Sequence, residues 1–163
     1  MKGILDKDMG FADLFTKFES GKESAVFVGY LRSSGVYKPK VKGGKAKALT
    51  VAQLGAIHEF GSSDGKHPPM RSFMRATESK NRAKIVALCS KLLNLVIDGH
   101  KGEKAALGTL GEYVKNLMKT TIQKGVPPAL KASTIARKGS SKPLIDTGQL
   151  INSIDWQVVG AKK

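Results

Sequence analysis

The stretch Pro143-Leu144-Ile145-Asp146-Thr147-Gly148-Gln149-Leu150-Ile151-Asn152-Ser153 decides how the two ends of this chain are joined. Pro143 cannot continue a preceding helix, and Asp146 or Thr147 can cap a new one. The apolar residues that follow at helical spacing are Leu150, Ile151 and Ile154. The stretch therefore predicts a short helix with one apolar side, which leads directly into the last part of the chain.

Two segments at opposite ends of the sequence have the composition of strands. Residues 24–31 read Ser-Ala-Val-Phe-Val-Gly-Tyr-Leu, rich in β-branched and aromatic residues, and residues 155–159 read Asp-Trp-Gln-Val-Val. We expect the second segment to pair with the first, because the short helix before it turns the chain back. This pairing would close residues 1–163 into a single domain.

Helical periodicity predicts two long helices in the middle of the chain, from about Ser72 to Ile97 and from about Glu103 to Gln123. Only a few residues join them, so they should pack as an antiparallel pair. Gly111 lies on the apolar side of the second helix, where it would let another helix approach closely. Shorter helices are expected at residues 10–20, 51–60 and 133–137. The fold class that these elements define is α+β, with a small antiparallel sheet on two long antiparallel helices and with long basic loops.

Positive charge is the unusual bulk property of the sequence. The 163 residues contain 28 Lys and Arg against 13 Asp and Glu, which gives a formal net charge of +15. Such an excess favours a polyanionic partner such as nucleic acid or an acidic protein surface. No apolar run approaches the length of a membrane span, and the first residues lack the apolar region of a signal peptide. We therefore expect a soluble protein made in a cytoplasm, with no membrane partner.

Much of this charge lies in segments rich in Gly and Pro, which are typical of loops. Residues 33–49 form a long arm-like segment without helical or strand periodicity, and such a segment is either a solvated loop or an arm that orders against a neighbouring subunit or an anion. The basic residues of this segment are Lys38, Lys40, Lys42, Lys45 and Lys47, and Arg32 lies just before it. A second basic segment covers residues 124–142. Cys89, the single cysteine, lies in a helical apolar pattern and is expected to be part of the core.

Catalytic and metal-binding patterns are not supported. His58-Glu59 resembles the start of a zinc-protease helix, but the second histidine ligand of that motif is replaced by Ser62. We therefore expect a half-buried histidine beside a solvated glutamate. No Gly-Lys pair is followed by the Ser or Thr of a phosphate-binding loop, and no nucleophile elbow occurs. The sequence predicts no enzyme, no cofactor and no metal site.

Three motifs together resemble the neck, tail-completion and virion-morphogenesis proteins of tailed bacteriophages. The first is Ala56-Ile57-His58-Glu59-Phe60-Gly61, the second is Pro68-Pro69-Met70-Arg71-Ser72-Phe73-Met74-Arg75, and the third is residues 142–154 around Leu144-Ile145-Asp146-Thr147-Gly148. That family has a similar order and spacing of motifs, and the resemblance covers roughly residues 50–160. Met70 and Ser72 differ from the residues that the family often has around the central arginine. This difference bears on which subgroup the chain resembles, and not on the resemblance to the family.

The resemblance implies a structural virion protein that forms a ring in the neck between the head portal and the tail. Its partners would be its own copies, other neck, connector or tail proteins and, in passing, genomic DNA; its location would be the virion, after assembly in the host cytoplasm. The expected subunit or ring contacts are the basic arm and the connection from residue 61 to residue 71, with His67, Pro68, Pro69, Arg71 and Arg75. Arg71 and Arg75 lie at a helix start, where the dipole disfavours positive charge, so they either pair with acids on a neighbour or are simply solvated. A tail terminator or minor tail subunit, and a nucleic-acid binder without sequence preference, remain the alternatives.

Overall fold

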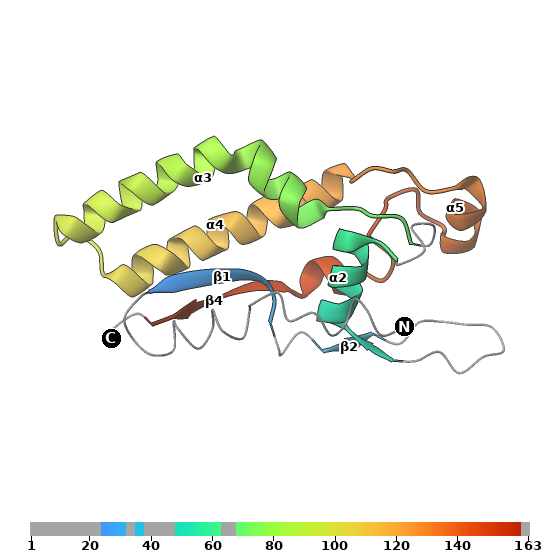
Figure 1. Ribbon diagram of the computed structural model, residues 1–163, viewed down its shortest axis with the longest axis horizontal. Coiled ribbons are helices and arrows are strands. Elements are labelled where there is room, and N and C mark those ends of the chain that lie inside the picture. The colour runs from blue at the N-terminus through green and yellow to red at the C-terminus, as the bar shows by residue number, and fades with distance from the viewer. Residues whose placement is uncertain (1–23, 32–34, 38–47, 63–67, 161–163) are drawn as a thin grey trace.

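The computed structural model of the chain describes residues 24–31, 35–37, 48–62 and 68–160, apart from the side chains of Arg137 and Lys138 (Figure 1). The elements, in chain order, are β1 (Ala25–Tyr30), β2 (Val36–Tyr37), β3 (Leu49–Thr50), α2 (Val51–Phe60), α3 (Phe73–Ile97), α4 (Glu103–Lys124), α5 (Ala132–Lys138), α6 (Gln149–Asn152) and β4 (Ile154–Val159). The helix expected at residues 10–20 and most of the basic arm lie outside the described residues. The α+β fold class is confirmed.

The first and last described strands form one antiparallel ribbon. β1 pairs with β4 so that Ala25 lies opposite Val159 and Tyr30 lies opposite Ile154. The predicted pairing of the two ends is therefore confirmed. The alternating side chains of a strand leave one face of this ribbon to be covered, and α4 lies along that face (Figure 1).

The two long helices give the molecule its length. α3 and α4 run antiparallel and pack against each other, and α4 lies between α3 and the ribbon, so it is the middle layer (Figure 1). Gly111 of α4 is buried, and a Cβ added there would lie 2.8 Å from both Cγ of Trp156 and Cγ2 of Val26. The close approach predicted at Gly111 is thus made by the β1–β4 ribbon, and the prediction that a helix approaches there is wrong.

The core lies at one end of this layered structure, where α2, the start of α3, the end of α4 and α6 meet. Its fully buried side chains include Phe73, Ile122, Ile154 and Val51. The other buried members of the same cluster are Met118, Val126, Leu144, Leu150 and Ile151. Residues from the second and third sequence motifs therefore share one core, to which α2 adds Val51.

Two local predictions require correction. Residues 33–49 were expected to contain no regular structure, but Val36 pairs with Thr50 and Tyr37 with Leu49, so the ends of that segment form a short antiparallel ladder. In the opening stretch, the N-cap of α6 is Gly148, with φ of 77°, and neither Asp146 nor Thr147 holds that position. The Thr147 hydroxyl, one residue before the N-cap, accepts a hydrogen bond from the Gln149 amide at 3.3 Å.

Candidate interaction site at the α2–α3 junction

The end of α2 and the start of α3 are held together by the chain between them. α2 begins with a capping box, in which Thr50 and Gln53 exchange hydrogen bonds, and ends at Gly61, with φ of 79°. A Cβ at Gly61 would lie 3.0 Å from the Met70 amide nitrogen, so a glycine lets the returning chain pass closely. The Arg71 amide then donates to the His58 carbonyl at 2.7 Å. These contacts place the last turn of α2 against the first turn of α3.

Glu59 caps α3 from outside that helix. Its carboxylate accepts from the Met74 amide at 2.9 Å, from the Arg75 amide at 3.2 Å and from Arg75 Nε at 3.1 Å. The first turn of α3 contains no acid, and the N-cap Ser72 makes no side-chain cap. A carboxylate at this position satisfies free amides and complements the positive end of the helix dipole. Glu59 is only 3% exposed, so the expectation of a solvated glutamate is wrong.

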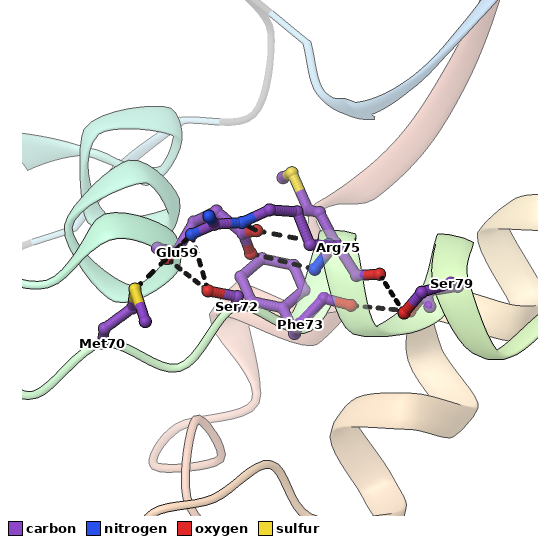
Figure 2. Close-up of polar contacts among 8 residues, drawn as sticks. Glu59, Met70, Ser72, Phe73, Arg75 and Ser79 are labelled. Carbon is purple, nitrogen blue, oxygen red and sulfur yellow. Dashed lines mark hydrogen bonds and ion pairs between the residues drawn. The ribbon is translucent and has the colours of Figure 1, made fainter.

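Arg75 is held in one orientation by several acceptors (Figure 2). Besides its ion pair with Glu59, its Nη2 donates to the Glu59 carbonyl at 3.0 Å and to Ser72 Oγ at 2.7 Å. Ser72 Oγ in turn donates to the same Glu59 carbonyl at 2.9 Å. The guanidinium lies 5.4 Å from the centre of the Phe60 ring, within the range of a cation–π contact. Arg75 is therefore paired within its own chain, although 59% of its side chain remains exposed.

Arg71 occupies a different environment from the one predicted. It is 5% exposed, and its Nε donates to the Pro128 carbonyl at 2.9 Å, with a longer contact of 3.5 Å from Nη2 to the Ala129 carbonyl. Burial lowers the pKa of the guanidinium from its usual value. Arg71 thus joins the junction to the segment after α4 in its own chain, rather than reaching an acid on a neighbour or standing in solvent.

The outer side of the junction presents an exposed group of apolar and charged side chains. Phe60 is 49% exposed and Met70 is 54% exposed, and Met70 Sδ lies 3.5 Å from Arg75 Nη2. Aromatic residues, methionine and arginine are the types enriched in protein interfaces. We call Glu59, Phe60, Met70, Ser72 and Arg75 the junction cluster.

The structure brings together part of the predicted contact set. Pro68, Pro69, Arg71 and Arg75 gather at the junction, with both prolines half-buried. The remaining predicted contact residues, Arg32, Lys38, Lys40, Lys42, Lys45, Lys47 and His67, lie outside the described residues.

Sequence reasoning missed the role of Glu59. A signal was present, because a helix start that carries an arginine and has no acid in its first turn favours a carboxylate from another element.

A second polar cluster lies on the surface between α4 and β4. Lys115 Nζ is 2.6 Å from Glu112 Oε2 and 3.6 Å from Asp155 Oδ1, and the Trp156 indole donates to Glu112 Oε2 at 2.8 Å. The hydrogen bond from Lys115, followed by that from Trp156, lowers the pKa of Glu112, and the hydrogen bond to Glu112 raises the pKa of Lys115. We call these four residues the Glu112 cluster.

Searches for other kinds of site gave no assignment. Among the described residues, no group of three or more His, Cys, Asp or Glu side chains is arranged to hold a metal ion. In the same part of the chain, no helix has both the length and the apolar character that a membrane crossing requires. Comparison of the sequence with protein-family models and with curated proteins, and of the fold with solved structures, gave no match.

Proposed function

We propose that the chain is a non-enzymatic structural protein of a tailed-phage virion, which forms a ring in the neck that joins the head to the tail. The proposal comes from the resemblance of three sequence motifs to phage neck and tail-completion proteins. In this reading the protein acts by binding its own copies and the rings above and below it. Contacts around a ring are heterologous, so each subunit must offer two different faces.

The observation that best supports the proposal is the meeting of the three motifs in one place. Glu59 from the first motif accepts hydrogen bonds from Met74 and Arg75 of the second. Phe73 from the second motif shares a core with Leu144 and Leu150 of the third. Motifs separated by about seventy residues of sequence thus act as one structural unit. The resemblance therefore involves residues that lie in one structural unit.

The direct test is the protein content of purified phage particles. The neck proposal predicts that the chain is present in a small, ring-like copy number, and that particles from a genome lacking its gene separate into heads and tails. A tail terminator would be present in similar amounts but at the end of the tail tube, which labelling of the particle would distinguish. Absence of the chain from infectious virions would contradict both assignments.

Nucleic-acid binding without sequence preference is retained as a second candidate because of the charge of one described segment. The exposed lysines of that segment are Lys124, Lys131 and Lys142. Between the first and the last of them the sequence contains no Asp or Glu. Binding through such a surface would weaken steeply as salt is raised, because counterions are released from the phosphates. The matched variants are Lys124→Glu/Lys131→Glu/Lys142→Glu and Lys40→Glu/Lys42→Glu/Lys45→Glu, and duplex binding that neither variant changes would contradict this role.

A further inference from the structure

One side of α3 carries a line of exposed lysines, which are Lys80, Lys84 and Lys91. Their spacing of four and seven residues is close to one and two helical turns, so the three side chains leave the helix within about 40° of one another around its axis. The first and the last of them lie roughly 16 Å apart along that axis. We call these three residues the lysine side of α3.

No described side chain neutralises these lysines. The residues three and four positions before and after each of them are not acidic. Within the described ranges, none of the three forms an ion pair with a carboxylate. Like charges four residues apart destabilise a helix, so Lys80 and Lys84 carry a cost that an anionic partner would remove.

The arginines of α3 differ from the lysine side in both position and pairing. Arg82 lies two residues from Lys80, which places it on the opposite side of the helix, where it pairs with Glu78 at 3.5 Å. Arg75 pairs with Glu59 at 3.1 Å. The arginine charges are therefore balanced within the chain, whereas the lysine charges are available to a partner.

The lysine side is open to a large partner. α3 is an outer layer of the structure, because α4 separates it from the β1–β4 ribbon (Figure 1). Between Lys84 and Lys91 the same side carries Ala87, which is exposed and too short to hold a rigid polymer away from the helix. Each strand of a DNA duplex places a phosphate about every 3.4 Å along the duplex axis. Several phosphates of one strand would therefore lie within reach of the three flexible lysine side chains.

The residue types favour a phosphate backbone over an acidic protein surface. Lysine is depleted in protein–protein interfaces, whereas it supplies the contacts that neutralise phosphates. α3 has no aromatic residue after Phe73 on which the bases of a single strand could stack. The chain has a net charge of +15, and its sequence contains no acid between Glu78 and Asp98. We infer that the lysine side of α3 binds the phosphate backbone of duplex nucleic acid without reading its sequence.

This inference goes beyond the neck proposal, and its surface is separate from residues 33–49 and 124–142. Three phosphate contacts give a weak and strongly salt-dependent interaction. The logarithm of the binding constant should fall with the logarithm of the salt concentration with a slope of about −2.7 from these contacts. That slope corresponds to a roughly 40-fold loss of affinity between about 50 and 200 mM salt.

Fluorescence anisotropy with the full-length chain and a short DNA duplex of mixed sequence tests the site. The lysine-side variant should bind at least about tenfold more weakly at about 50 mM salt, with a slope shallower by about 2.7. A control variant that lowers the net charge equally, by adding three acids at exposed positions on another side of α3, should lose less than about threefold. The two variants are Lys80→Gln/Lys84→Gln/Lys91→Gln and Ser79→Glu/Val86→Glu/Leu93→Glu. Equal weakening by both variants, no weakening by the first, or no duplex binding by the natural chain would overturn the inference.

A charge-preserving variant separates loss of the contact from loss of the fold. Lys80→Arg/Lys84→Arg/Lys91→Arg keeps all three positive charges and should bind the duplex within about twofold of the natural chain. Loss of binding by this variant, with a circular dichroism spectrum like that of the natural chain, would overturn a contact based on charge.

A competitor tests the class of partner. Polyglutamate carries its charges less densely than a duplex does, so it should displace the duplex only at a much higher concentration of charge. Displacement at an equal concentration of charge would overturn the assignment to nucleic acid in favour of an acidic protein surface.

These outcomes are independent of the neck proposal. Duplex binding through the lysine side, in a chain that virions lack, would leave the contact standing and remove only the neck role. Virions that contain the chain, together with failure of the duplex test, would leave the neck role and remove the contact.

Discussion

The junction cluster and the Glu112 cluster each combine a carboxylate, a basic side chain and an aromatic ring, but they differ in burial. Glu59 is 3% exposed and accepts from two backbone amides of α3, whereas the side chain of Glu112 is 49% exposed and makes its described contacts with side chains. A buried carboxylate that has lost its water depends on its protein partners, and a solvated one can regain water. The same combination of residue types therefore contributes strongly to stability in the buried junction cluster and only weakly in the exposed Glu112 cluster.

Replacement of Glu59 should produce the largest effect. Glu59→Ala leaves two amides of α3 and Arg75 Nε without the carboxylate that accepts from them, so we expect a loss of about 2–4 kcal/mol in the free energy of unfolding, measured by urea denaturation. Glu59→Gln keeps one acceptor oxygen and should lose about half as much. If Glu59→Ala costs no more than Glu112→Ala, burial does not distinguish the two clusters.

Packing beneath Trp156 should matter more to the Glu112 cluster than its ions do. Gly111→Ala puts a methyl group 2.8 Å from Trp156 and Val26, which should cost about 1–3 kcal/mol, partly offset by about 1 kcal/mol of improved helix propensity. Gly108→Ala is the matched control, because its Cβ would meet only the outer edge of the same indole, at 3.1 Å. Thermal unfolding should rank Gly108→Ala at or above the natural chain and Gly111→Ala below it. The reverse order would disprove the proposed importance of close packing at Gly111.

Arg75→Lys examines the geometry of the junction rather than its charge. A lysine cannot reproduce the planar contacts with Glu59, Ser72 and Phe60, so we expect a loss of about 1 kcal/mol. Arg82→Lys changes an exposed ion pair with Glu78 of 3.5 Å and should have almost no effect. Equal denaturation midpoints for the two variants would mean that the fixed orientation of Arg75 adds no stability.

The Glu112 cluster should give the smallest effect, and pH should reveal it. The pKa of Glu112 is lowered in the folded chain, so its ionised form stabilises the protein above the unfolded pKa, and this contribution is lost as the pH falls through the folded value. Glu112→Gln should therefore be slightly less stable than the natural chain near neutral pH and equally stable in acid. Melting curves of both proteins across acidic pH would test this, and a difference that grows in acid would contradict it.

The fold was largely predictable from the sequence, because its main elements are marked by local composition and by periodic spacing of apolar residues. β-Branched and aromatic composition identified both strands of the ribbon, and apolar periodicity identified α3 and α4 to within a residue or two. The β2–β3 ladder was not predictable in this way, since two-residue strands carry no period. The partner of Gly111 was also misassigned, because a glycine indicates a close approach but not which element makes it.

The candidate site was predicted only in part. The stretch from Pro68 to Arg75 was selected from the sequence as a subunit or ring contact, and in the structure its Arg71 and Arg75 bind acceptors of their own chain. The burial of Glu59 and Arg71 depends on how two helices and the segment after α4 converge, which no local pattern of residues encodes.

The pairing of β1 with β4 has a consequence for how the protein is made. Tyr30 pairs with Ile154, so β1 leaves the ribosome long before its partner strand is translated. The α3–α4 hairpin depends on contacts between neighbouring segments, so it can form before β4 is synthesised. During that time the backbone groups of β1 have no strand partner. A transcript truncated shortly before residue 154 would therefore yield a chain with two formed helices and an open strand edge, a product prone to aggregation and proteolysis.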